Sequence, residues 1–96
     1  MKILALEQDL PGVTSEQFQP YLKTEAAKVW ELNQAGVIRE TYFRQDRASA
    51  ILVLECADEE NAKRILGTFP LVRAGLISFE LIPLIPYPGF SRLFGE

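Results

Sequence analysis

The sequence contains no histidine among its 96 residues, and this absence limits the chemistry that the chain can perform. It excludes Ser-His-Asp and Cys-His nucleophile systems, and also the haem, zinc and non-haem iron sites that use histidine ligands. Proton transfer must therefore use carboxylates, tyrosine, lysine, the single cysteine or bound water. The candidate catalytic residues are Glu25 and Tyr42, and the candidate substrate-binding residues are Arg39, Arg44 and Phe69.

Glu25 lies in a segment whose apolar residues recur at helical spacing. It falls inside the apolar arc of this predicted helix, which is formed by Phe18, Leu22, Ala26, Val29 and Leu32. A carboxylate pressed toward a sheet loses hydration, which raises its pKa toward the range useful for proton transfer. Two structural alternatives remain open: the side chain reaches water at the edge of the stripe, or it pairs with an arginine.

Three further candidates lie on the next predicted strand, residues 37–44. Because strand side chains alternate, we expect Arg39 and Tyr42 on opposite faces, whereas Tyr42 and Arg44 share one. An arginine beside an apolar cavity would bind a substrate carboxylate through its bidentate fork. The alternative is that both arginines pair with carboxylates across strands or across a dimer, at Glu7, Glu55 or Glu80.

Two other residues have a structural and a chemical interpretation. The run Phe69-Pro70-Leu71 predicts a shaped turn, and the ring of Phe69 could also form the wall of a cavity. Cys56 ends the most apolar predicted strand, where a cysteine is more often a small buried hydrophobe than a nucleophile. Without a neighbouring histidine, its thiolate would need another means of activation.

The elements that must position these residues follow in the order β-α-β-β-α-β. Strands are predicted over 2–9, 37–44, 48–57 and 76–82, helices over 20–35 and 59–66, and a short opening turn over 15–18. The continuous apolar run 50–54 predicts a central strand, and Pro83 places the last strand at the edge of the sheet. This order is typical of the ferredoxin-like α+β fold, a four-stranded antiparallel sheet with two helices on one face.

Two helices cover only one face of such a sheet. We assign Ile3, Ala5, Ile51 and Val53 to the other face, for which a second sheet is the most economical cover. We therefore expect a homodimer or a larger homo-oligomer, assembled as a dimeric α+β barrel. Residues 1–85 form this domain, and residues 86–96 form an apolar, Pro-rich tail. The tail is expected to be extended and to pack on a neighbouring subunit, or else to fold back on its own domain.

Composition and charge exclude several kinds of partner. The net charge of −3, with no run of Lys or Arg, gives no electrostatic footprint for nucleic acid or for an anionic membrane. No apolar run reaches the roughly 18 residues of a membrane span. The apolar stretch at the N-terminus is too short for a signal peptide, and an acidic residue follows it too early. We therefore expect a cytoplasmic protein that binds neither nucleic acid nor membrane, with no metal site and no cofactor.

Several short motifs together resemble the muconolactone delta-isomerase family: Glu25 followed by Gly36-Val37-Ile38-Arg39, the pair Phe43-Arg44, the Phe-Pro-Leu turn and the final Pro86-Tyr87-Pro88. The resemblance spans nearly the whole chain. It implies a dimeric α+β barrel, often assembled into larger rings, and a cofactor-free 1,3-proton shift on a small unsaturated lactone carboxylate. This chain departs from the family pattern in lacking histidines and in having one more residue between Arg39 and Arg44.

The leading hypothesis is therefore a cofactor-independent isomerase acting on a small acidic molecule. Arg39 or Arg44 would hold the substrate carboxylate, Glu25 would move the proton, and Tyr42 would donate a hydrogen bond to the developing enolate oxygen. A second hypothesis is a non-catalytic small-ligand-binding or assembly protein in which Glu25 and the arginines form structural ion pairs. A third is a cofactor-free monooxygenase of the same barrel type.

Overall fold

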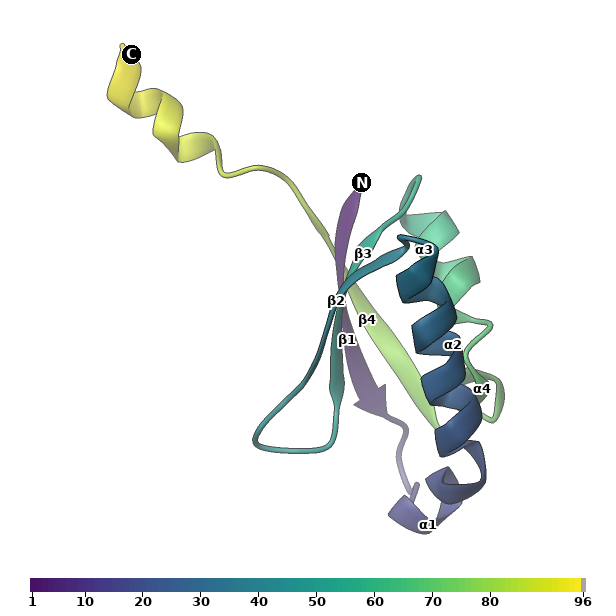
Figure 1. Ribbon diagram of the computed structural model, residues 1–96. Coiled ribbons are helices and arrows are strands. Elements are labelled where there is room, and N and C mark those ends of the chain that lie inside the picture. The colour runs from purple at the N-terminus through teal and green to yellow at the C-terminus, as the bar shows by residue number, and fades with distance from the viewer. Residues whose placement is uncertain (96) are drawn as a thin grey trace.

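The computed structural model describes residues 1–95, which form a four-stranded antiparallel sheet with helices on one side (Figure 1). The strand order is β2-β3-β1-β4, so β3 and β1 are central and β4 is an edge strand, as predicted. The arrangement is the ferredoxin-like α+β fold. The elements are β1 (Lys2–Asp9), α1 (Ser15–Phe18), η1 (Gln19–Tyr21), α2 (Leu22–Gln34), β2 (Ile38–Phe43), β3 (Ala50–Glu55), α3 (Glu59–Leu66), α4 (Pro70–Arg73), β4 (Ile77–Leu84) and η2 (Pro88–Phe94).

Local sequence signals explain most of these bounds. The side chain of Asp58 accepts a hydrogen bond from the backbone N–H of Asn61 at 2.7 Å and so caps α3. The helix expected over 20–35 is divided, because Pro20 lies in the 3₁₀ turn η1 that precedes α2. After α2 the chain turns at Gly36, whose φ of +79° lies in the left-handed region that glycine enters without strain.

The core lies between the sheet and the helices, on what we call the covered face. Ile3 and Ala5 of β1 pair with Leu54 and Leu52 of β3, and all four side chains are buried. The helices and the segment after α3 contribute Leu32, Ala62, Leu66 and Phe69. The assignment of Ile3 and Ala5 to the uncovered face is therefore wrong, because alternation separates two aliphatic sets without indicating which set the helices cover.

The other side of the sheet, here called the open face, has no helix over it in the described part of the chain (Figure 1). Leu4 and Leu6 occupy this face opposite Val53 and Ile51, and Ile82 lies beside Leu4 on β4. All five side chains are only partly buried. An apolar strip of this kind on a small domain indicates a surface whose burial against a partner lowers the free energy.

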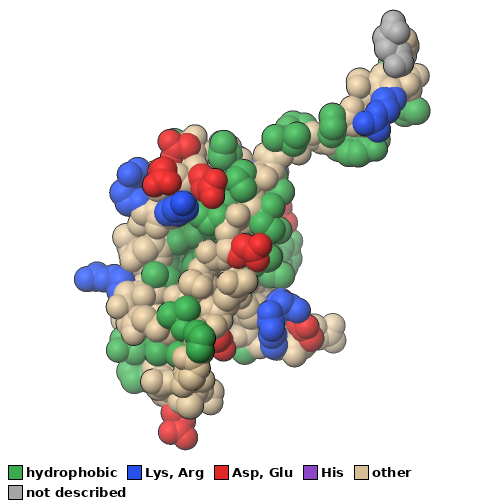
Figure 2. All heavy atoms as spheres, turned by 180° about the vertical axis from the view of Figure 1, so that it is seen from behind, with side chains coloured by type: hydrophobic (Ala, Val, Ile, Leu, Met, Phe, Trp, Pro, Cys, Tyr) green, Lys and Arg blue, Asp and Glu red, His purple; other side chains and the backbone are tan. Residues whose placement is uncertain are grey.

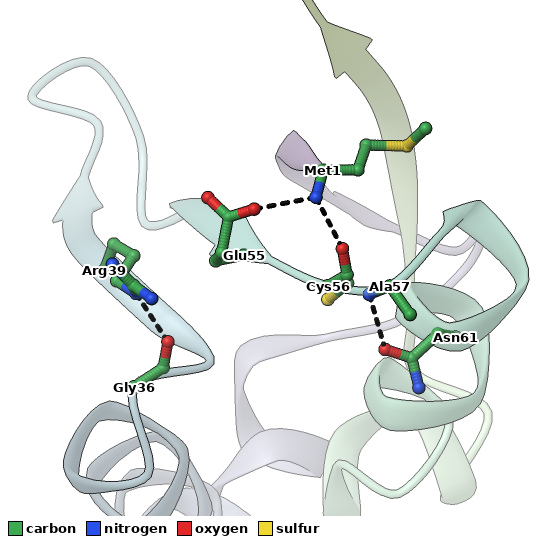
Figure 3. A network of polar contacts seen from close by, with 7 residues as sticks. All are labelled: Met1, Gly36, Arg39, Glu55, Cys56, Ala57 and Asn61. Carbon is green, nitrogen blue, oxygen red and sulfur yellow. Dashed lines mark hydrogen bonds and ion pairs between the residues drawn. The ribbon is translucent and has the colours of Figure 1, made fainter.

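The start of β1 is fixed to the end of β3. The Met1 α-amino group donates hydrogen bonds of 2.7 Å to Glu55 Oε2 and to the Cys56 carbonyl oxygen (Figure 3). Cys56 itself is buried, as expected for a small hydrophobe, and its burial raises the pKa of the thiol. This cysteine is therefore poorly suited to act as a nucleophile.

The tail after β4 leaves the body of the molecule (Figure 1). It is extended as far as Tyr87, but residues 88–94 form the 3₁₀ helix η2, so the expected extended path is wrong for that segment. Pro88 stands at the first position of η2, where a proline suits a helix start. Residue 96 lies outside the described part. Figure 2 shows hydrophobic side chains along the tail, and those exposed are Ile85, Tyr87, Phe90, Leu93 and Phe94.

Candidate functional site

A pocket of about 570 Å³ lies between α1 and α2 on one side and the covered face of the sheet on the other. Four phenylalanine rings line it: Phe18, Phe43, Phe69 and Phe79. Phe69 packs edge-on against Phe79, with ring centres 5.6 Å apart and an angle of 80° between the rings. This volume and this apolar lining suit a small organic molecule.

The helix α2 places Glu25 in the pocket. Its Oε1 accepts a hydrogen bond of 3.0 Å from the backbone N–H of Leu71, in the first turn of α4, where N–H groups lack partners within the helix. Oε2 takes part in no hydrogen bond within residues 1–95. Burial raises the pKa of Glu25, the Leu71 N–H partly offsets this, and the charge of Glu7 raises it further. In the described part of the chain Glu25 thus pairs with no arginine, and it is only partly exposed to solvent.

A second carboxylate, Glu7, lines the same pocket from β1, although no sequence motif indicated it as a site residue. Its side chain is only 8% exposed. Oε1 accepts a hydrogen bond of 2.9 Å from the Ala50 N–H, and the Glu7 carbonyl oxygen accepts one of 2.7 Å from Ser49 Oγ. Burial raises the pKa of Glu7, the Ala50 N–H opposes this, and the charge of Asp9 adds to it. Alternation along β1 placed Glu7 with Ile3 and Ala5, so the error about the covered face also hid Glu7.

The rest of the polar lining carries no positive charge. Its exposed members are Asp9, Thr14, Ser15, Gln19 and Thr41. Among the described residues that line the pocket there is no lysine or arginine. The pocket therefore offers hydrogen-bonding groups and negative charge, but no group that would neutralise a substrate carboxylate.

The two candidate arginines do not line this pocket. Arg39 Nε donates a hydrogen bond of 2.6 Å to the Gly36 carbonyl oxygen, close to the end of α2 (Figure 3). Arg44 binds Asp46 through two hydrogen bonds, of 2.9 Å from Nε and 2.7 Å from an Nη. Both arginines thus use partners near in sequence, and their predicted role in substrate binding gains no support from their positions.

Tyr42 also lies outside the pocket, on the open face opposite Ile51. Its hydroxyl donates a hydrogen bond of 2.7 Å to Glu40 Oε1, and this bond raises the pKa of Tyr42. A register shift between Ile38 and Glu40 changes the alternation along β2 and directs Thr41 and Phe43 into the pocket. Of the five candidate residues, the structure therefore brings together only Glu25 and Phe69.

No group of three or more Cys, Asp or Glu side chains in residues 1–95 is arranged to hold a metal ion. No helix in that range is both long and apolar enough to cross a membrane.

No family model matches the sequence, and no curated protein sequence matches it. Among solved structures, the chain is similar to 5-chloro-2-hydroxyhydroquinone dehydrochlorinase from Burkholderia phenoliruptrix, in complex with 2,5-dihydroxybenzoquinone. The TM-score is 0.65, the match covers 88% of this chain and 94% of that chain, and 18% of the residues are identical. This likeness shows a shared fold, and the neighbour is a small-molecule-processing enzyme.

Proposed function

We propose that the chain is a cofactor-independent, isomerase-like enzyme that moves a proton within a small unsaturated lactone or a related carbonyl compound, with Glu25 as the acid–base group. One observation carries the proposal. The carboxyl of Glu25 is fixed through one oxygen by the Leu71 N–H, and its other oxygen, which has no hydrogen-bonding partner within residues 1–95, lies beside an apolar pocket of about 570 Å³.

The reaction class follows from the properties of this carboxylate. A 1,3-proton shift needs one group that removes a proton from one carbon and returns it to another. A carboxyl whose pKa is raised by burial is a stronger base than a solvated one, yet still releases the proton. The rigid helix α2 and the bond from Leu71 hold the group in one orientation, which reduces the entropic cost of proton transfer.

The structural neighbour bears on the size of the proposed ligand. Its name gives a small chlorinated hydroxyhydroquinone as its substrate, and it is in complex with 2,5-dihydroxybenzoquinone. Both are small six-membered ring compounds. The shared fold can therefore hold a molecule of the size proposed here, whereas the particular reaction of this chain rests on Glu25.

We also propose that the enzyme is a homodimer in which two open faces pack together, and that the tail lies across a neighbouring subunit. The partly exposed Leu4, Leu6, Ile51 and Val53 would be buried by such a partner. The tail leaves its own domain (Figure 1), so its exposed aromatic rings would find cover on the partner as well.

One observation favours a second candidate, a non-catalytic protein that binds a small ligand. The residues expected to hold and polarise a substrate, Arg39, Arg44 and Tyr42, lie outside the pocket. A binding protein needs the apolar pocket but no proton transfer. The two candidates therefore differ in whether a bound carbonyl compound exchanges hydrogen with solvent.

The test is hydrogen exchange in D₂O, followed by proton NMR, on small β,γ-unsaturated lactones incubated with the protein. We expect the wild-type chain to exchange the acidic C–H and Glu25→Gln to exchange it at least about 100-fold more slowly. Glu16→Gln, at an exposed position of α1, is the matched control and should keep the wild-type rate. Equal rates for Glu25→Gln and wild type would exclude the proposed role of Glu25.

A further inference from the structure

We infer that Glu7 is a second proton-transfer residue of the pocket, and that the two carboxyl groups together select an uncharged unsaturated carbonyl compound over a carboxylate. The inference rests on the proposed function and deepens it. It adds a residue that neither the sequence motifs nor the resemblance indicated, and it changes the charge of the expected substrate.

The geometry of the two carboxyls is similar although they come from different layers of the fold. Glu25 projects from α2, and Glu7 projects from β1 on the covered face. Each accepts one backbone hydrogen bond through Oε1, from Leu71 and from Ala50 respectively. In the part of the chain that the structure describes, neither Oε2 has a hydrogen-bonding partner. Each carboxyl thus has a fixed orientation and one oxygen available to a ligand.

Two carboxyls that share an apolar pocket do not ionise independently. Charging one makes charging the other less favourable, so an intermediate pH leaves one protonated and the other ionised. The protonated group can donate a hydrogen bond or a proton, and the ionised group can accept one. Glu7 can therefore perform the task expected of Tyr42, which instead donates to Glu40 on the open face.

The proposed 1,3-proton shift needs only the substrate and the two carboxyl groups. The Glu25 carboxylate removes a proton from the carbon next to the substrate carbonyl, so the C–H bond breaks and an O–H bond forms on Glu25. The released electron pair forms a C=C bond, and the carbonyl oxygen takes the proton of Glu7, which gives a dienol. Glu25 then returns its proton to the γ-carbon while Glu7 recovers the dienol proton. The double bond has moved, and both carboxyls have regained their starting states.

The pocket lining decides between charged and uncharged substrates. It includes Glu7, Asp9 and Glu25 but, within the described residues, no lysine or arginine. A substrate carboxylate would lose hydration in this pocket without meeting a cation. An uncharged ring would contact the four phenylalanines and hydrogen-bond to the carboxyls. We therefore expect a lactone or ketone that has no carboxylate.

A purely structural role for Glu7 is testable because it makes a different prediction. The pairing of β1 with β3 is regular up to Leu6 and Ile51, and the Glu7 side chain binds the next N–H, that of Ala50. In Glu7→Gln the amide oxygen can still accept this hydrogen bond, but the group no longer transfers a proton. Glu7→Ala loses both properties. A structural role predicts a defect only in Glu7→Ala, and a chemical role predicts one in both variants.

The experiment measures kcat/KM for hydrogen exchange against pH with two probes. The first is α-angelica lactone, an uncharged β,γ-unsaturated lactone, and the second is its analogue with carboxymethyl in place of methyl. We expect wild type to show a bell-shaped profile and to prefer α-angelica lactone by at least about tenfold. Glu7→Gln should lose at least about tenfold in kcat/KM and one limb of the bell, while its thermal unfolding stays cooperative.

The failures of the two proposals are distinguishable. If Glu25→Gln is inactive but Glu7→Gln keeps the wild-type rate and both limbs of the bell-shaped pH profile, the inference about Glu7 is wrong and the proposed function stands. A preference for the carboxymethyl analogue would likewise overturn the inference about substrate charge alone. If wild type exchanges hydrogen in neither probe, the proposed function is contradicted and the inference falls with it.

Discussion

Polar side chains on the two sides of the sheet differ in their solvent exposure and in their hydrogen-bonding partners. Between the covered face and α2, Glu7 and Glu25 are partly or largely withdrawn from water and are held by backbone N–H groups. On the open face, Tyr42 is 55% exposed and its hydroxyl binds Glu40, two residues away. An exposed polar pair of this kind costs little and contributes little to stability. The covered carboxyls lose hydration that their single hydrogen bonds do not fully replace.

This difference indicates where function is to be sought. A folded chain retains a buried carboxylate at some cost in stability, and such groups are concentrated at sites that need a shifted pKa. The candidates Arg39, Tyr42 and Arg44 rested on residue type and on resemblance, and all three are exposed to solvent. The candidates that the structure supports are those whose ionisation is made unfavourable by their surroundings.

The largest expected effect concerns the wall of the pocket. Phe69 is 1% exposed and packs edge-on against Phe79. Phe69→Ala should lower the free energy of unfolding by about 3–5 kcal/mol, because it leaves a cavity in the core. Urea denaturation followed by circular dichroism measures this value. Phe43→Ala, at a pocket residue that is 69% exposed, is the control and should change the free energy by less than about 1 kcal/mol.

The next prediction concerns the open face. If two open faces pack together, Ile51→Lys places an unpaired charge in the interface twice, once from each subunit. The dimer dissociation constant should rise at least about 100-fold, measured by analytical ultracentrifugation. Lys23→Glu, at an exposed position of α2, should leave it unchanged. A wild-type chain that sediments as a monomer would contradict the proposed dimer.

A smaller effect concerns pH and stability. The pKa of Glu25 is raised in the folded chain, so the folded state binds more protons than the unfolded state between the two pKa values. Stability therefore decreases as the pH rises from below 4.5 through the raised pKa. Glu25→Gln cannot ionise and should have a Tm roughly a few degrees higher at neutral pH, with no such gain in acid. Differential scanning fluorimetry across the pH range measures this, and a lower Tm at neutral pH would contradict it.

The smallest effect is expected for the substitution of Arg44, an exposed arginine. Arg44 binds Asp46 in the connection between β2 and β3, away from the pocket lining. Arg44→Ala should change the free energy of unfolding by less than about 1 kcal/mol. It should also leave KM for the uncharged lactone within about twofold of wild type, because Arg44 does not line the pocket and its loss should not change substrate binding. A tenfold rise in KM would show that Arg44 contacts the substrate after all.

The order of elements was predictable from the sequence, whereas for Glu25 the sequence left a pocket position open beside two structural alternatives. Helical periodicity puts Glu25 among apolar residues, and the structure places it in the pocket. Phe69 was identified as a possible cavity wall, and its ring lines the pocket. Local sequence thus indicated both positions, through helical spacing for Glu25 and through the Phe-Pro-Leu turn for Phe69, whereas the roles of the two residues stay predictions.

The remaining candidates depended on features that spacing does not show. The register shift between Ile38 and Glu40 decides which side chains of β2 enter the pocket, and no residue type in that stretch predicts it. The choice of covered face decides that Glu7 is buried, and both faces of β1 are aliphatic. Tertiary packing, and not local pattern, therefore determined which polar residues meet.

The most direct test of the central claim is a carbon-13 NMR titration of the carboxyl groups of Glu25 and Glu7 in the wild-type protein. It requires no substrate. We expect both groups to titrate above the ordinary glutamate pKa of 4.5, and Glu7→Gln to lower the pKa of Glu25, because a neighbouring charge has been removed. Two carboxyls that titrate independently at or below 4.5 would contradict the account.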